Sequence, residues 1–237
     1  MLQIETILCR AGHMDNYAYL LIDKETEISA IIDPSEPAPI IARCKELNVK
    51  PDYILNTHHH FDHTDGNLEL KQLYQAKVVA NEADKNRIPG FDIGVREGEI
   101  FMLGQSSAQI IDVSAHTQGH ILWYFAKEKA LFTGDTLFNL CIGGLFEGNT
   151  AQMFKALQKI KSLPDETLFY PGHEYTVHGA ADAFHSDPQN PEIRKYLELA
   201  DQKLKQGLPV APVSLGFEKK CNPYLKASTQ EEFEKLF

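Results

Sequence analysis

Basic residues are scarce in this chain. Its 237 residues include 23 Lys and Arg against 33 Asp and Glu, which gives a net charge of -10 at pH 7. A general nucleic-acid-binding protein needs a basic face that displaces counterions from phosphates, so this balance argues against that class. The same charge means that an anionic substrate needs a local basic patch to offset the repulsion.

Cysteine is also scarce, and Cys9, Cys44, Cys141 and Cys221 form no CxxC pair. Scattered cysteines favour free thiols in a reducing compartment over a disulfide framework. No run of about 18 apolar residues could span a membrane, and the polar first residues lack the basic start and apolar stretch of a signal peptide. We therefore expect a cytoplasmic protein that binds neither membrane nor nucleic acid, as a monomer or a weak dimer.

The order of elements indicates an α/β protein. Short apolar stretches such as Leu2–Cys9 and Tyr17–Asp23 predict strands, and Pro37–Leu47 has the apolar spacing of an amphipathic helix. After Asn149 the spacing changes to that of helices. We predict an α/β domain over residues 1–173 and a small helical C-terminal domain over residues 174–237.

The most informative stretch, residues 57–63, reads Thr-His-His-His-Phe-Asp-His and follows a predicted strand at Tyr53–Leu55. Alternate residues of an extended segment point the same way, so His58 and His60 can aim at one point. Asp62 and His63 follow where the chain turns and can serve a second, neighbouring point. Imidazole and carboxylate are ligands that suit zinc, iron or manganese.

Three further donors follow predicted strands elsewhere in the chain. His116 comes after the strand that ends near Val113, Asp135 after Ala130–Phe132, and His173 after Thr167–Tyr170. Strand ends at one edge of an α/β sheet are where functional sites are usually assembled. Together with the first cluster, these residues predict a site for two metal ions.

With these motifs the sequence resembles the metallo-β-lactamase superfamily, and within it the glyoxalase II enzymes, or hydroxyacylglutathione hydrolases. The resemblance covers nearly the whole chain. Its segments are Asp15-Asn16-Tyr17, Asp33-Pro34, residues 58–63, His116-Thr117-Gln118-Gly119-His120, Gly134-Asp135-Thr136-Leu137-Phe138, Leu145-Phe146-Glu147-Gly148 and Pro171-Gly172-His173-Glu174-Tyr175-Thr176.

The resemblance implies an αββα sandwich followed by a helical domain. It implies two divalent metal ions per chain, zinc in the first place and iron or manganese as alternatives. His58, His60 and His116 would hold one ion; Asp62, His63 and His173 would hold the other. Asp135 would bridge them, and Asp62 and Asp135 would be the catalytic carboxylates.

The implied reaction is hydrolysis of a thioester, S-lactoylglutathione or a related S-(2-hydroxyacyl)glutathione, to glutathione and a 2-hydroxy acid such as D-lactate. A hydroxide between the two metals would attack the carbonyl carbon. A thiol has a pKa of only about 8.5, so the thiolate leaves without a dedicated general acid. Cys141 is interpreted as a packing residue rather than a nucleophile.

The resemblance also suggests substrate contacts. Tyr175 matches a family tyrosine, Gly144, Leu145 and Phe146 lie in the corresponding loop, and Lys226 matches a basic position. The loop lacks the family's basic residue, and the C-terminal basic pair has no clear counterpart; Lys219 and Lys220 are candidate substitutes. The thiol is therefore left open between glutathione and another carrier.

The remaining histidines receive weaker interpretations. His59 alternates away from the site, His120 and Asp33 are candidates to orient ligands, and His13, His178 and His185 match no ligand position.

Three alternative functions remain open: a lactonase of the same superfamily, a mononuclear iron persulfide dioxygenase, and a non-catalytic metal-binding protein. His60 argues against flavin-linked diiron reductases, which have Glu there.

Overall fold

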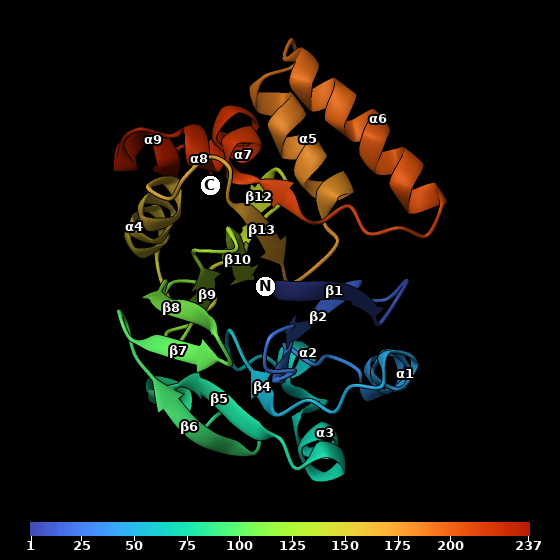
Figure 1. The fold of residues 1–237 in the computed structure, drawn as a ribbon. Helices are drawn as coiled ribbons and strands as arrows, with labels where there is room; N and C mark the ends of the chain where they lie inside the picture. Colours follow the sequence, from blue (N-terminus) through green and yellow to red (C-terminus); the bar gives the residue numbers. More distant parts are fainter.

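The computed structural model describes all residues, 1–237, and contains two stacked six-stranded sheets with helices outside both (Figure 1). The first sheet has the order β1 (Leu2–Cys9), β2 (Asn16–Asp23), β3 (Ser29–Ile32), β4 (Tyr53–Leu55), β5 (Lys77–Asn81) and β6 (Phe91–Val95). The second has the order β14 (Val213–Ser214), β13 (Leu168–Pro171), β10 (Ala130–Gly134), β9 (Ile121–Phe125), β8 (Ser106–Asp112) and β7 (Ile100–Leu103). The predicted αββα sandwich is confirmed.

Strand β2 shows how the sequence builds two cores. All eight of its residues are buried. Because successive side chains point to opposite faces, Tyr19 and Leu21 pack between the two sheets, while Leu20 and Ile22 belong to the apolar cluster on the outer face of the first sheet. A strand covered on both faces reads as a continuous apolar run rather than an alternating one.

Helices complete the outer layers. Helices α1 (Pro37–Leu47) and α3 (Asn67–Tyr74) bury Ile40, Cys44 and Leu70 in the outer core of the first sheet. Helix α4 (Thr150–Lys161) begins at a capping box made by Asn149 and Gln152 and packs its buried face on the second sheet. The shorter elements are α2 (Phe61–Thr64), the 3-10 helix η1 (Glu82–Asp84) and the β11 (Leu137–Phe138) and β12 (Cys141–Ile142) pair.

The C-terminal residues form α5 (Thr176–Ser186), α6 (Pro191–Lys205), α7 (Leu215–Cys221), α8 (Pro223–Lys226) and α9 (Gln230–Glu234). Between α6 and α7, β14 adds an edge strand to the second sheet by pairing with β13. Leu225 and Phe233 join the apolar cluster beneath α4. This region therefore does more than pack helices, since it also completes the sheet.

Several features differ from the sequence-based expectation or extend it. Strand β6, the β11–β12 pair and the edge strand β14 were not among the expected strands. All four cysteines are free and buried, which confirms the thiol interpretation. None of the helices has the length and apolar character needed to cross a membrane.

Hydrogen bonds join the two sheets beside the histidine-rich stretch at residues 57–63. The buried Trp123 of β9 donates its indole N–H to the carbonyl oxygen of Asn56, which follows β4, at 3.3 Å. The next carbonyl, of Thr57, accepts the backbone N–H of Ile121 at 2.9 Å. These bonds fix the segment that enters the histidine-rich stretch against the second sheet.

Candidate metal centre

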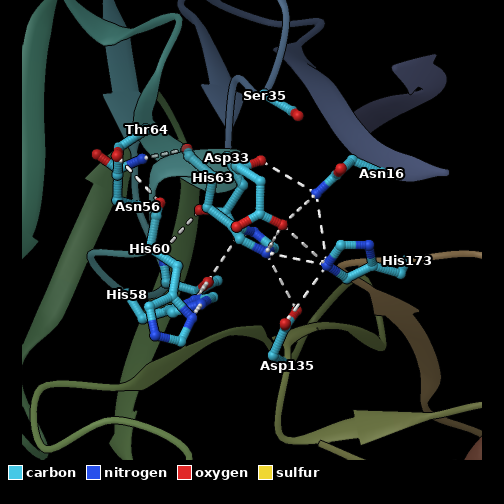
Figure 2. A network of polar contacts seen from close by, with 12 residues as sticks. Asn16, Asp33, Ser35, Asn56, His58, His60, His63, Thr64, Asp135 and His173 are labelled. Carbon is cyan, nitrogen blue, oxygen red and sulfur yellow. Dashed lines mark hydrogen bonds and ion pairs between the residues drawn. The ribbon is translucent and has the colours of Figure 1, made fainter. Parts of the chain in front are cut away.

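The predicted ligands meet at one edge of the sandwich, although they come from four separate segments. His58 and His60 follow β4, and Asp62 and His63 lie on the short helix α2. His116 lies in the β8–β9 turn, Asp135 follows β10 and His173 follows β13. Figure 2 shows His63, Asp135 and His173 directed toward one another, with His58 and His60 beside them.

The first cluster consists of three histidines. Nδ1 of His60 lies 3.1 Å from Nε2 of His58 and 3.1 Å from Nε2 of His116. The ligand atoms of all three lie within 4.8 Å of one another, as the geometry of a metal site requires.

The second cluster consists of Asp62, His63 and His173. Nε2 of His63 lies 3.3 Å from Nε2 of His173, and Oδ2 of Asp62 lies 3.4 Å and 3.2 Å from the same two nitrogens. Asp135 lies between the clusters. Its Oδ1 is 3.2 Å from His63, and its Oδ2 is 3.4 Å from His173 and 3.6 Å from Nε2 of His116.

In four of the five histidines, the ring nitrogen that faces away from the site has a partner that sets the tautomer. His116 donates Nδ1–H to the carbonyl of Gly144 at 2.7 Å, and His173 donates Nδ1–H to the carbonyl of Met14 at 2.8 Å. Nδ1 of His63 lies 3.0 Å from Oδ2 of Asp33. With these protons directed outward, each ring in its neutral form presents the lone pair of Nε2 to the site.

His58 is oriented by a two-step relay. Its Nδ1 lies 3.0 Å from the hydroxyl of Thr57, and that hydroxyl donates to Oδ2 of Asp33 at 2.6 Å. Because the hydroxyl proton is committed to Asp33, the oxygen accepts from His58. Asp33 therefore supports one histidine of each cluster, as the sequence interpretation of an orienting residue suggested.

Sequence reasoning missed Asn16 as a site residue. Its side-chain amide donates to the backbone carbonyl and to Oδ2 of Asp62, both at 3.0 Å (Figure 2). Asn16 is fully buried at the start of β2. The only signal was its position inside the Asp15-Asn16-Tyr17 segment, which predicts no particular contact by itself.

Gly172 allows the final segment to approach the centre. A Cβ atom at this position would collide with Oδ1 of Asp135 and with the ring of His63. The Pro-Gly-His segment therefore needs glycine because the backbone before His173 runs directly against the side chains of Asp135 and His63. This is a close-approach requirement, so any side chain here would displace them.

The charges of the two clusters differ. Burial lowers the pKa of His58, His60 and His116, to about 4 for His60, so these rings are neutral at pH 7. In the second cluster burial is outweighed by carboxylates: Asp135 and Asp62 raise the pKa of His173 to about 9, and Asp135 with Asp33 holds the pKa of His63 well above its usual value. The carboxylates of the second cluster therefore stabilise a positive charge at this position.

These observations fit a pair of cations. Four buried imidazoles direct lone pairs inward, and Oδ1 of Asp135 is buried without a hydrogen-bond donor. Imidazole nitrogens and carboxylate oxygens gathered this closely are ligands that suit divalent metal ions. A third grouping, Asp33 with His58 and His63, also lies within 4.8 Å, but there the ring Nδ1 atoms of both histidines are already engaged.

A cavity of about 400 Å³ opens onto the ligands. Of the residues expected to contact substrate, Tyr175, Gly144 and Phe146 line it. Tyr175 stacks on His173 with ring centroids 4.6 Å apart. Leu145 packs instead against the apolar cluster beneath α4, and Lys226 forms an ion pair with Asp187 at 2.9 Å. Neither of the last two lines the cavity.

A second cavity, of about 440 Å³, shares Met14, Ile142 and Tyr175 with the first. Its other lining residues are His13, Asp15, Cys141, His178 and Asp182. No Lys or Arg lines either cavity. The basic patch expected for an anionic substrate is therefore absent from the walls of both cavities. Lys219, a candidate substitute for the missing basic residues, forms an ion pair with Asp165.

Two histidines without a ligand position have clear structural partners. Nε2 of His120 accepts the backbone N–H of Asp135 at 3.1 Å, and its ring stacks on His58 at 4.7 Å. His120 thus positions Asp135 through its backbone, in agreement with the orienting role suggested for it. His59 turns away from both clusters and faces Asp84 at 3.4 Å.

Comparison with known proteins identifies the family. The model of the metallo-β-lactamase superfamily matches residues 13–173, and the model of the hydroxyacylglutathione hydrolase C-terminus matches residues 174–236. A hydroxyacylglutathione hydrolase of Pelagibacter ubique is 43% identical over 235 residues, covering 99% of this chain and 97% of that relative. The chain belongs to the hydroxyacylglutathione hydrolase family.

Other members of the family and the superfamily agree. A hydroxyacylglutathione hydrolase of Rhodospirillum rubrum is 41% identical over 94% of this chain and 87% of its own length. The crystal structure of ETHE1 from Myxococcus xanthus superposes with a TM-score of 0.74 at 25% identity, over 98% of this chain and 88% of that one. The superfamily and the His/Asp clusters together support binding of divalent metal.

Proposed function

We propose that this family member hydrolyses the thioester of an S-(2-hydroxyacyl)glutathione, with S-lactoylglutathione as the test substrate, and releases glutathione and a 2-hydroxy acid. The observation that carries the proposal is the convergence of seven donors from four segments beside a cavity walled by Tyr175 and Phe146. The names of the relatives support the substrate class.

We propose that His58, His60 and His116 hold one divalent ion, that Asp62, His63 and His173 hold a second, and that Asp135 bridges them. Zinc suits this donor set, with iron or manganese as alternatives. When bound, such ions supply a hydroxide nucleophile near neutral pH and polarise the substrate carbonyl.

The chain's own residues position the reactants. Asp135 is held in place by the N–H that it donates to His120, and Asp62 by the amide of Asn16. Tyr175, Phe138 and Phe146 form apolar walls that exclude bulk water around the acyl group. Water loses one proton to become hydroxide, and the hydroxide oxygen joins the acyl carbon. The C–S bond then breaks, and its electron pair leaves on sulfur as a thiolate, which needs no protonation by the chain. The carboxylic acid formed releases its proton to solvent.

The test is steady-state hydrolysis of S-lactoylglutathione by protein loaded with zinc, iron or manganese, compared with chelator-treated protein. An acyl-homoserine lactone and glutathione persulfide with oxygen consumption serve as competing substrates. We expect thioester hydrolysis to exceed both by at least about a hundredfold in kcat/KM, equivalent to about 2.7 kcal/mol. Preference for the lactone, or oxygen consumption, would overturn the proposal.

A further inference from the structure

The loop from Gly143 to Gly148 forms one wall of the catalytic cavity. Phe146 is 71% exposed, and its ring edge lies over His60 and His116 with centroids 5.3 Å and 5.1 Å away. The carbonyl of Gly144 is the acceptor that orients His116. An exposed aromatic side chain keeps such a position only if the backbone beneath it is fixed, so the anchors of this loop matter to the site.

Glu147 ties this loop to the turn that carries His116. Its Oε2 accepts the backbone N–H of Gln118 at 2.7 Å, and its carbonyl accepts from the side-chain amide of Gln118 at 2.7 Å. The backbone N–H groups of Phe146 and Glu147 both donate to the carbonyl of His116 at 3.3 Å. These two bonds are long. The shorter contacts between loop and turn are the one made by the Glu147 side chain and those made by the backbone carbonyls of Glu147 and Gly144.

The other oxygen of Glu147 is held from a third segment. Arg87, which lies between η1 and β6, donates Nη1–H to Oε1 of Glu147 at 2.6 Å and Nε–H to Oδ1 of Asp84 at 3.0 Å, and its Nη2 also contacts Asp84. The Asp84 side chain is 1% exposed. The Arg87 side chain is 35% exposed and that of Glu147 is 29% exposed. A forked guanidinium with a buried anchor is more rigid than an isolated surface ion pair.

Asp84 also packs against the histidine-bearing segments. A Cβ atom at Gly119 would collide with the Asp84 carboxylate, so this carboxylate lies directly on the turn between His116 and His120. His59, which holds no cluster position, faces Asp84 at 3.4 Å and Glu147 at 3.7 Å. The network therefore touches every segment that carries a member of the first cluster.

We propose that Arg87, Asp84 and Glu147 form a positioning network that sets Phe146 over the first cluster and thereby determines substrate affinity. None of the three lines the catalytic cavity. They act through the loop at 143–148, because Glu147 is the neighbour of Phe146 and is fixed from two sides. The consequence for substrate affinity rests on the proposed function, whereas the ordering of the loop does not.

The first test uses backbone amide hydrogen exchange on the full chain. We compare wild type with Glu147→Ala, the conservative variants Glu147→Gln and Arg87→Lys, and Glu166→Ala. Glu166 forms an ion pair with Lys129 in which both side chains are 57% exposed, which makes it a matched control. Exchange at Phe146 and Glu147 is expected to rise at least about tenfold in Glu147→Ala, less in Glu147→Gln and Arg87→Lys, and not at all in the control or in β9.

The second test separates KM from kcat for S-lactoylglutathione. Loss of a uniform binding contact raises KM without changing kcat, so Glu147→Ala should raise KM about three- to tenfold with kcat within about twofold, and Glu147→Gln should recover part of the loss. Unchanged exchange at Phe146 and Glu147, or a uniform rise that includes β9, would overturn the network. If wild type does not hydrolyse the thioester, the proposed function fails, and the exchange result still decides the network.

Discussion

Oδ2 of Asp33 lies 3.0 Å from Nδ1 of His63 and accepts the hydroxyl of Thr57, whose oxygen faces His58. A single carboxylate that is 2% exposed thus orients one histidine of each cluster, although it is not one of the seven proposed metal ligands. Residues in this position usually change metal affinity by about 10- to 100-fold when they are replaced.

We therefore expect Asp33→Asn to weaken metal retention. The amide can still accept one hydrogen bond, but it presents an NH2 group to one of its present donors. The dissociation constant of the more weakly held ion, measured by competition with a chromophoric chelator, should rise about tenfold or more. Asp52→Asn is the control, because Asp52 lies just before β4 and its Oδ2 accepts the backbone N–H of Ser29. Equal affinities in both variants would contradict the role given to Asp33.

The charge of the second cavity gives another prediction. Asp182 is exposed on α5, lines the cavity that adjoins the catalytic one, and forms no ion pair. Asp182→Lys replaces a negative charge by a positive one near an anionic substrate, so KM for S-lactoylglutathione should fall about three- to tenfold, with a smaller effect at high salt.

Glu69→Lys provides the matched control for Asp182→Lys. Glu69 is exposed on α3 and lines neither cavity. Glu69→Lys therefore changes the net charge by the same amount as Asp182→Lys, but away from both cavities. If both variants lower KM equally, the effect comes from net charge rather than from the charge of the second cavity, which would contradict this prediction.

The buried carboxyl of Glu218 makes the stability of the folded protein depend on pH. Burial in α7 raises the pKa of this carboxyl to about 8, although Asn222 and the backbone N–H of Leu140 donate to it. The pKa is higher in the folded state than in the unfolded one. The contribution of Glu218 to stability is therefore fully present below pH 4.5 and is lost as pH rises through about 8.

Glu218→Gln removes this titration. Relative to wild type, the free energy of unfolding of the variant should increase between pH 5 and pH 8 by an amount of order 3 kcal/mol, and the difference should level off above that range. Urea unfolding at several pH values measures it. The titratable neighbours Cys141, Cys221 and Tyr196 remain neutral in this window, because burial raises the pKa of each of them. A difference that does not change with pH would contradict the assignment.

Local sequence patterns predicted the parts of the fold that are long or strongly apolar. Strands such as β2 and β9 were recognisable because every position is buried. The two-residue strands β11, β12 and β14 exist only because of their pairing partners, and no local periodicity can indicate them. Strand β6 contains Asp92 and Gly94, residue types depleted in strands, and only Val95 of its five residues is buried.

The same contrast holds for the site. His58, His60 and the strand-end donors could be proposed from spacing and motif, because His and Asp are residue types that commonly bind metal ions. Asn16 and Arg87 could not, because their importance lies in partners that are 46 and 60 residues away in the sequence. Lys226 matched a family basic position, yet its ion pair with Asp187 depends on how α8 packs near the end of α5. Motifs therefore indicate ligands, whereas supporting contacts require the fold.

The measurement that tests the account most directly is the metal content of catalytically active protein, determined by elemental analysis alongside Asp135→Ala and Glu166→Ala. The account predicts two divalent ions per chain in wild type and in Glu166→Ala. In folded Asp135→Ala it predicts fewer than two ions and at least about a hundredfold lower activity, as expected when a ligand shared by two ions is lost. One ion per chain in fully active protein, or full metal content and activity in Asp135→Ala, would contradict it.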